Sequence, residues 1–161
     1  LRHLGISIGK NDNLHQTSQA REVGAEAIQV VYNRLDRTPE HDVFPACRRD
    51  DLGVLARVPL ASGYLTGKYR PDATFDEPSD VRSRHDPSDV QRKLEEAERI
   101  RHEEVPEGVE MATWALAWCL QHPAVTCVIP GCKSVEQVEA NARAAELDIV
   151  RDDHPQAVAG A

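Results

Sequence analysis

The sequence has few aromatic residues, and too few basic residues to balance its acidic ones. Phe, Trp and Tyr make up 4% of the 161 residues, and 19 Lys and Arg against 27 Asp and Glu give a formal net charge of −8. Surfaces that bind nucleic acids or anionic membranes are usually basic, so we expect neither as a partner. No apolar run approaches the ~20 residues of a membrane-spanning helix, and we expect no signal peptide. These absences favour a cytoplasmic protein with a single core.

The sequence also lacks the spacings of common metal and nucleotide motifs. No C-x-x-C pair occurs and no His lies at zinc-finger spacing, so we expect no metal site and reduced thiols at Cys47, Cys119, Cys127 and Cys132. Cys132 lies in a predicted turn and is either a reactive thiol or, more commonly, a semi-buried inert one. No G-x-G-x-x-G follows a predicted strand, and residues 5–10 do not match a P-loop.

Hydrophobic periodicity and turn residues predict four strands, each followed by a helix, with one extra helix after the third strand. The predicted strands are 1–8, 27–32, 53–58 and 125–129, and helices begin near 13, 38, 88, 107 and 134. The first strand starts at once, as if the sequence began in mid-fold. Alternating strands and helices predict a parallel sheet with helices outside it.

Local features refine this prediction. Residues 70–87 hold three prolines and many charges, which is typical of a long surface loop that is functional or mobile. Helix 107–121 is apolar over most of its girth and should be buried. His122 is expected to be a local cap or a surface residue. Capping pairs are predicted at Asn13 and Gln16, Ser88 and Gln91, and Ser134 and Gln137, and inward-facing residues at Val43, Phe44 and Cys47.

The most informative stretch is 125–141, which predicts a strand, a tight turn at Pro130-Gly131 and a helix capped by Ser134. A strand that turns into a helix start presents free backbone N–H groups and a positive dipole end. Lys133 lies in the same turn. These residues indicate either a phosphate-binding turn or an ordinary strand–helix unit with a solvated lysine. A buried stripe is predicted along the helix at Val135, Val138, Ala142 and Ala145.

Four strand–helix units leave two folds open. A (β/α)8 barrel needs eight units and typically about 250 residues. The chain is therefore either half of such a barrel or a small doubly wound sheet without its glycine fingerprint.

Three segments resemble the C-terminal half of the aldo-keto reductases, in the order and at about the spacing found in that family. They are 28–35 (I-Q-V-V-Y-N-R-L), 53–69 (G-V-L-A-R-V-P-L-A-S-G-Y-L-T-G-K-Y) and 115–141 (A-L-A-W-C-L-Q-H-P-A-V-T-C-V-I-P-G-C-K-S-V-E-Q-V-E-A-N). The resemblance covers residues 1–145 and implies strands five to eight of a (β/α)8 TIM-type barrel, followed by a loose tail at 146–161. Members of the family bind NADP(H) and reduce aldehydes and ketones.

The resemblance also implies which residues hold the nicotinamide and the pyrophosphate. Ser7 and Gln29 match the positions that contact the carboxamide, although Ile8 stands where the family often has Asn. Gln29 is otherwise an inward-pointing residue satisfied by its neighbours. Arg57 occupies the position where many members stack a Tyr on the nicotinamide, and a guanidinium also stacks on a flat ring. By the resemblance, Lys68 reaches a phosphate oxygen, and backbone N–H groups wrap the pyrophosphate along Val58, Pro59, Leu60, Ala61, Ser62 and Gly63.

The adenosine end would lie at the second strand–helix turn. By the resemblance, the 2′-phosphate and adenine are held by Gly131, Cys132, Lys133, Gln137 and Asn141. Gln137 stands where many members have Arg, which weakens the case for a strong NADP preference, whereas Lys133 can supply the positive charge. Gln137 has the alternative role of capping its own helix.

The catalytic Asp, Tyr, Lys and His of the family follow strands two to four, and nothing in this chain matches those motifs. We therefore expect no catalytic residues here and no Tyr/Lys group around any histidine. Two functions follow. The chain is either the cofactor half of a reductase for small carbonyl substrates, inactive alone and completed by a missing N-terminal half, or a non-catalytic half-barrel that binds a nucleotide or a partner. A half-barrel exposes two edge strands, so self-association is also expected.

Overall fold

The computed structural model describes residues 2–147 of the chain. The predicted tail, 146–161, lies outside the described residues from position 148 onward.

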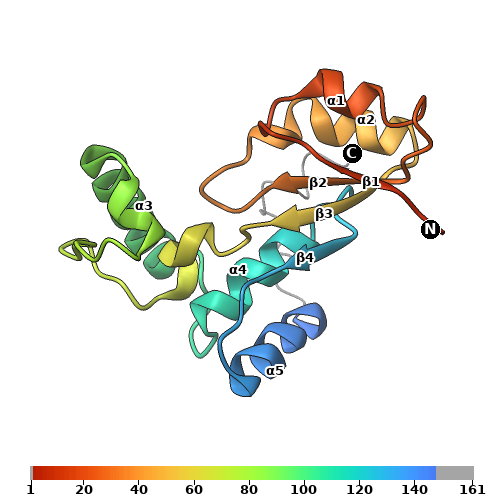
Figure 1. Ribbon diagram of the computed structural model, residues 1–161. Coiled ribbons are helices and arrows are strands. Elements are labelled where there is room, and N and C mark those ends of the chain that lie inside the picture. The colour runs from red at the N-terminus through yellow and green to blue at the C-terminus, as the bar shows by residue number, and fades with distance from the viewer. Residues whose placement is uncertain (1, 148–161) are drawn as a thin grey trace.

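Four strands form one parallel sheet in the order β1-β2-β3-β4 (Figure 1). The α/β class and the parallel sheet predicted from the sequence are confirmed. Sequential strands are neighbours throughout, so every connection is a crossover of the kind that parallel pairing requires. The strands are β1 (Gly5–Ser7), β2 (Ala27–Val31), β3 (Gly53–Arg57) and β4 (Cys127–Ile129).

The two outer strands are shorter than predicted because pairing sets their ends. The β1 ladder begins where Gly5 meets Ala27, although the sequence predicted a strand from the first residue. The last strand was predicted from 125 but begins at Cys127. Just before it, the hydroxyl of Thr126 accepts the Val54 N–H at 3.0 Å, so a side chain takes the place of a backbone acceptor.

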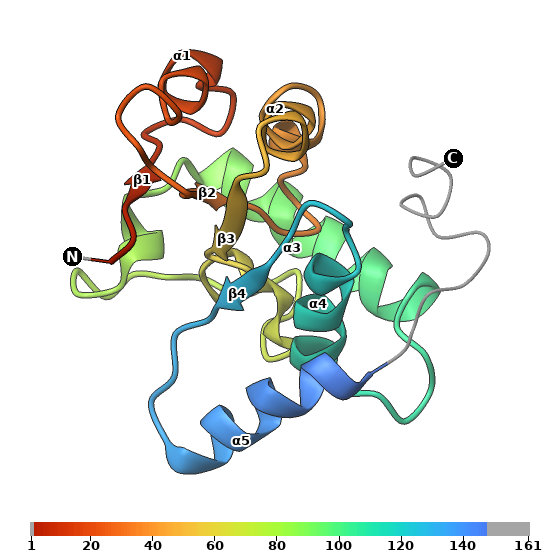
Figure 2. The ribbon, with the colours of Figure 1, turned by 90° about the vertical axis from the view of Figure 1, so that its right-hand side faces the viewer.

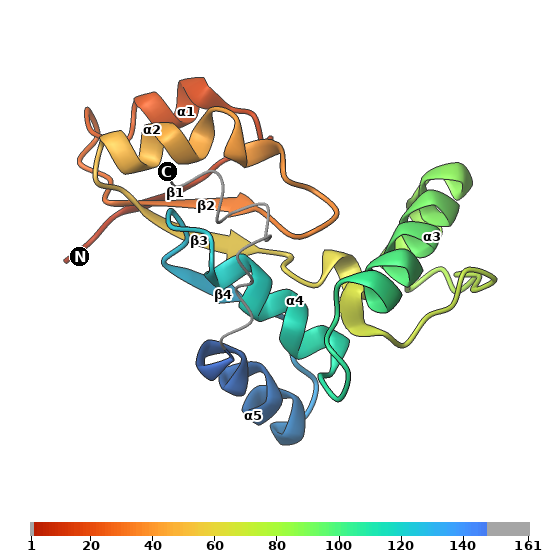
Figure 3. The same ribbon diagram turned by 180° about the vertical axis from the view of Figure 1, so that it is seen from behind.

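Helices follow the strands as predicted, with 3-10 turns between them, but α2 and α4 begin at Val43 and Met111, later than the starts predicted near 38 and 107. Viewed along the strands, α1, α2 and α4 follow one another around one side of the curved sheet (Figure 2). Figure 3 shows α3 standing beyond the carboxyl ends of β2 and β3. The α-helices are α1 (Leu14–Ser18), α2 (Val43–Arg49), α3 (Pro87–Glu103), α4 (Met111–Leu120) and α5 (Val135–Arg143), and the 3-10 turns are η1 (Thr38–Glu40), η2 (Ala61–Thr66), η3 (Val81–Arg84) and η4 (Ala144–Glu146).

Two of the three predicted caps are confirmed. Asn13 and Ser134 each accept the backbone N–H three residues on, at 3.0 and 3.3 Å. The cap predicted at Ser88 is wrong, because Asp86 caps α3 instead. Its carboxylate accepts the N–H groups of Ser88 and Asp89, and Pro87 fits the first helical position because its φ is preset. The long loop 70–87 therefore ends one residue earlier than predicted, and it contains η3.

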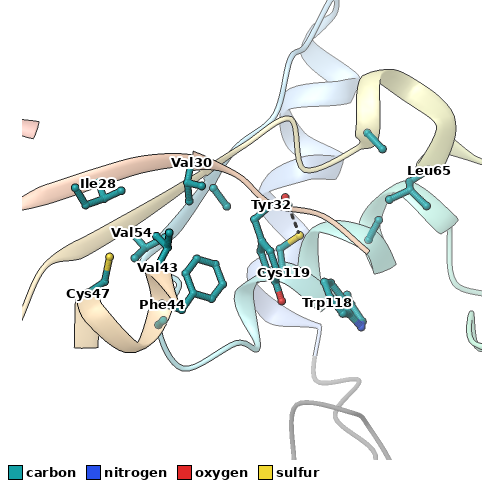
Figure 4. Close-up of a cluster of buried hydrophobic side chains, with 14 of the residues drawn as sticks. Ile28, Val30, Tyr32, Val43, Phe44, Cys47, Val54, Leu65, Trp118 and Cys119 are labelled. Atoms are coloured by element: carbon teal, nitrogen blue, oxygen red, sulfur yellow. Dashed lines mark hydrogen bonds between the residues drawn. The ribbon is translucent and has the colours of Figure 1, made fainter. Parts of the chain in front are cut away.

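The core lies between one face of the sheet, α2 and α4, and it continues through η2 to the inner side of α3. Alternate residues of β2 and β3 are fully buried on this face, where Figure 4 shows Ile28, Val30 and Val54 against the side chains of α2 and α4. The predicted inward-facing residues of α2, Val43, Phe44 and Cys47, are all buried there. The opposite face of the sheet carries the half-buried residues of the same strands.

The predicted buried stripe on α5 is wrong. Val135 and Val138 are 68% and 53% exposed, and no other described element covers them. Periodicity indicated correctly that one side of this helix is apolar. It carried no information about what would lie against that side.

His122 is buried, at 8% exposure, so its placement on the surface is wrong and its local capping role is the alternative that holds. Its Nδ1 accepts the Ala124 N–H at 3.2 Å, and its ring packs against Phe44 at 4.6 Å between centroids. Within residues 2–147, no helix is both long and apolar enough to cross a membrane.

Candidate functional site

The half-buried face of the sheet brings two predicted site residues together. Register places Ser7 of β1 beside Gln29 of β2, and Gln29 beside Leu55 of β3. The Gln29 side-chain amide donates to the Ser7 hydroxyl at 3.1 Å. Strand alternation turns these side chains away from the helices. The pair fits a carboxamide contact and equally fits an inward-pointing glutamine satisfied by its neighbour, the two alternatives of the sequence analysis.

Arg57 ends β3 on the same face, in register with Val31 and Ile129. Its Nε is buried and has no hydrogen-bond partner, and its guanidinium makes no ion pair with any described residue. A guanidinium without an ion pair can stack on a flat ligand ring or donate hydrogen bonds to a ligand.

The segment directly after β3 is held in an uncommon backbone conformation. Val58, Ala61 and Ser62 have φ values of 55°, 49° and 56°, and Gly63 has φ 94°. Positive φ is an outlier for a β-branched residue such as Val58. Strain of this kind persists only where the surroundings impose it, and it clusters at functional sites. Ala61 and Gly63 donate their N–H groups to the carbonyls of Val58 and Leu60, at 2.9 Å each, so only the other N–H groups of this turn can face an anion.

Asn33 is one of the groups that impose this conformation. It is buried at 3% exposure, and its side-chain amide donates to the Val58 carbonyl at 3.1 Å. The side-chain oxygen of Asn33 accepts the N–H groups of Leu35 and Asp36. Sequence reasoning missed this positioning role, although Asn33 stands at the carboxyl end of a predicted strand, directly after Tyr32.

Arg82, in the long loop, is the second residue that sequence reasoning missed. Its guanidinium lies 4.0 Å from the centroid of Phe75 and 4.3 Å from that of Tyr69. Its Nε and Nη2 are bonded to Asp80, and Nη2 also donates to the Tyr69 hydroxyl at 2.9 Å. Nη1 has no partner in the described part of the chain, and a Cβ on Gly63 would lie 3.2 Å from it.

These contacts tie the long loop to itself and to Tyr69, and they leave one guanidinium nitrogen beside Gly63. The hydrogen bonds from Arg82 hold the pKa of the Asp80 carboxyl well below its usual range, and the charge of Lys133 lowers it further. The charge of Lys133 is therefore close enough to affect the ion pair between Arg82 and Asp80. Lys68 is exposed, with its ammonium 5.3 Å from the Tyr69 ring centroid.

The turn between β4 and α5 gathers the predicted adenosine residues around one helix start. The Gln137 side chain accepts the Lys133 N–H at 2.7 Å, so it caps its own helix, as the alternative proposed. Asn141 donates to the Cys132 sulfur at 3.1 Å. Cys132 is exposed, so the semi-buried placement is wrong. No atom lies within 4 Å of a Cβ built on Gly131, so packing does not require glycine there.

One expectation about the histidines is wrong. The Tyr64 hydroxyl lies 3.2 Å from Nδ1 of His85, and Lys93 stands 5.8 Å from the Tyr64 ring centroid. Tyr64 is nevertheless a poor proton donor, because burial raises its pKa. Its side chain is 2% exposed. Tyr32 is similar, since burial and its bond to Glu40 raise its pKa strongly.

Other possible sites fall elsewhere. Two open pockets of about 640 and 370 Å³ contain none of the predicted site residues. The larger one has ion-paired arginines in its wall, among them Arg34, Arg37 and Arg99. The described range 2–147 holds no group of three or more side chains arranged to ligate a metal.

Known proteins are similar to this chain in sequence. A sequence 32% identical over 143 residues is an uncharacterized oxidoreductase, YrpG, of Bacillus subtilis, and the match covers 85% of this chain and 40% of that protein. The aldo-keto reductase yakc [NADP(+)] of Schizosaccharomyces pombe is 27% identical over 146 residues, covering 88% of this chain and 42% of that protein. The chain thus spans about two fifths of the length of these relatives.

Solved structures give the same picture. The holo form of the aldo-keto reductase AKR11C1 from Bacillus halodurans superposes with a TM-score of 0.71 at 25% identity, over 99% of this chain and 49% of that one. The four parallel strands therefore correspond to about half of that fold. The sequence model of the Aldo/keto reductase family matches residues 1–159. With nearly its whole length covered by this match, the chain belongs to the aldo/keto reductase family.

Proposed function

We propose that this chain is the cofactor-binding part of an NADP(H)-dependent oxidoreductase that reduces aldehyde or ketone carbonyls. The observation that carries the proposal is the strained segment from Val58 to Gly63, with the unpartnered Nη1 of Arg82 beside it. A guanidinium nitrogen without a partner is suited to a phosphate group, and so are the N–H groups of the segment that its own turn does not use. The yakc relative, whose name includes NADP(+), supports the choice of nucleotide.

The residues on the sheet fit the nicotinamide end. In the proposal, the amide of Gln29 and the hydroxyl of Ser7 bind the carboxamide, and Arg57 lies against the ring. The buried Nε of Arg57 has no partner, and a ligand atom that accepts its N–H would remove the cost of leaving that donor unsatisfied. The segment Val58, Pro59, Leu60, Ala61, Ser62 and Gly63 and the exposed Lys68 would hold the pyrophosphate.

The turn at the start of α5 fits the adenosine end. Lys133 is exposed, and its ammonium has no ion pair among the described residues. Because the Gln137 side chain is engaged in capping, the proposal assigns the 2′-phosphate to Lys133 and the N-terminal end of the helix dipole. Gly131, Cys132 and Asn141 would lie along the adenine and its ribose.

The chemistry divides between the cofactor and the protein. When bound, NADPH supplies the hydride that a carbonyl carbon accepts. The residues of this chain bind and orient it: Gln29 fixes the carboxamide, and Arg82 and Lys68 neutralise phosphate charge. The group that protonates the carbonyl oxygen is assigned to a part of the barrel that residues 2–147 do not contain. We therefore expect this chain alone to have no reductase activity.

The alternative function is a binding module that holds the nucleotide without turnover. It uses the same site and differs only in what the chain is combined with. Turnover of an aldehyde by the chain together with a four-strand counterpart favours the enzyme. Tight binding without turnover in that combination favours the module.

The test is a calorimetric titration of the purified chain with NADPH and with NADH. Lys133→Ala is expected to weaken NADPH binding about tenfold, the effect of one charge-assisted contact, and to leave NADH unchanged. Arg143→Ala is the matched control, because it removes a like charge from the opposite end of the same helix. Absence of binding by the wild-type chain, confirmed as folded by circular dichroism, would contradict the proposal.

A further inference from the structure

Arg57 differs from the other half-buried arginines of the described chain. Arg34, Arg37, Arg82, Arg99 and Arg101 are each half-buried, and each has a carboxylate 2.5 to 2.7 Å away. Arg57 has none, and its Nε is buried without a partner. Its neighbours in register are Val31 and Ile129, both apolar. The charge on this face is therefore uncompensated by any described residue.

This uncompensated charge bears on the redox state of the cofactor. The inference rests on the proposed function. If Gln29 holds the carboxamide and the segment after Arg57 holds the pyrophosphate, the nicotinamide ring crosses the sheet at Arg57. Gln29 is in register with Leu55, two residues before Arg57 on the same strand face. The guanidinium then stands next to the ring in both redox states.

The two redox states differ by one unit of charge on that ring. The reduced ring is neutral, and a guanidinium can stack on it without electrostatic cost. The oxidised ring is a pyridinium cation, which a neighbouring cation repels, most strongly where solvent is excluded. A tyrosine at this position would have the opposite sign of interaction, because an aromatic face attracts a cation.

We propose that Arg57 makes the site discriminate between the redox forms of the cofactor, binding NADPH more tightly than NADP⁺. The oxidised cofactor then dissociates more readily, so the site exchanges spent cofactor for fresh. Hydride transfer itself is unaltered in this scheme, since the two electrons and the proton pass as hydride to the carbonyl carbon whatever the affinity of either form.

The experiment measures the ratio of two dissociation constants, Kd for NADP⁺ over Kd for NADPH, by calorimetry on the full chain. Arg57→Met removes the charge and keeps a long side chain, and the ratio is expected to fall about tenfold. Arg57→Tyr should lower it at least as far, and Arg57→Lys should keep most of it. Arg84→Met, a change at an exposed arginine of η3, serves as the control and should leave the ratio unchanged.

The outcomes separate this inference from the proposed function. If the wild-type chain binds both forms and Arg57→Met leaves the ratio unchanged, the discrimination by charge is wrong while the cofactor assignment stands. If the folded wild-type chain binds neither form, the cofactor assignment fails and this inference fails with it. Circular dichroism and a thermal melt of each variant identify a change of fold, and if Arg57→Met changes it, Arg57→Tyr decides the matter because it also removes the charge.

Discussion

Asn33 and Val58 are joined by a hydrogen bond of 3.1 Å that ties the carboxyl end of β2 to the first strained residue after β3. The donor is a side chain with 3% exposure, and the acceptor belongs to a residue whose φ is 55°. A buried amide thereby fixes the segment proposed to hold the pyrophosphate.

Asn33→Asp is expected to destabilise the chain by about 2 kcal/mol, because it replaces the donor with a second oxygen facing the Val58 carbonyl. The change keeps the acceptor that Leu35 and Asp36 use, so it isolates the bond to Val58. Urea unfolding measures the loss. Gln19→Glu, the same chemical change at an exposed side chain, is the control. An unaltered unfolding midpoint for Asn33→Asp would show that the bond does not hold the segment.

Removing the Arg82 guanidinium should weaken the binding of NADPH and NADH equally. Arg82→Met loses the free Nη1 and the bonds to Asp80 and Tyr69. We expect about a tenfold rise in both dissociation constants, since a hydrogen bond to a charged group contributes about 1.5–3 kcal/mol. Calorimetric titrations measure both constants, and Arg84→Met, two residues on, is the matched control. A loss confined to NADPH would instead assign Arg82 to the 2′-phosphate.

Folding stability should fall as the pH drops below about 6.5, the ordinary pKa of histidine. Burial lowers the pKa of His122 and Arg37 and Arg48 act in the same direction, while Glu40 opposes them. The unfolded chain then binds a proton that the folded chain excludes, so stability is present above the unfolded pKa and is lost as the pH falls through it. One proton gives a slope of at most about 1.4 kcal/mol per pH unit.

The variant that tests this prediction is His122→Gln. In urea titrations between pH 7.5 and pH 5, its free energy of unfolding should change less with pH than that of the wild type. His41→Gln, a change at an exposed histidine, should leave the pH dependence as in the wild type. An equal slope in all three proteins would mean that His122 is not the titrating group.

The chain is expected to self-associate in a concentration-dependent manner. Within residues 2–147, the outer edges of β1 and β4 pair with no further strand, and Val135 and Val138 expose an apolar side of α5. Light scattering after size exclusion should show species larger than a monomer, and the double change Val135→Gln and Val138→Gln should reduce them. Glu139→Gln on the same helix is the control. A monomer at every concentration would contradict the expectation.

Sequence reasoning reached the parts of the fold that local patterns encode. The order of strands and helices, the cap at Ser134 and the inward-facing Val43, Phe44 and Cys47 follow from spacing within one element, and all were predicted. The cap at Asp86 was missed because Ser88 and Gln91 offered an equally good local pattern. Pro87 decided the start through its fixed φ.

Contacts between distant segments were beyond these patterns. The bond from Asn33 to Val58 spans 25 residues, and the approach of Arg82 to Gly63 depends on how the long loop folds back. The apolar side of α5 shows the same limit, since periodicity identifies a side and not its cover. The predicted site residues themselves came from the family resemblance and stay predictions, to be tested by the titrations above.

Along β2 and β3, residues that stabilise the fold alternate with residues that face the proposed cofactor. Residues 28, 30, 54 and 56 face the core, and residues 29, 31, 55 and 57 face the side of the proposed cofactor. Selection for a different nucleotide can therefore change every second residue, while the residues between them keep the protein folded. Such interleaving makes these strands a favourable starting point for laboratory evolution, because new binding and retained stability do not compete for the same positions.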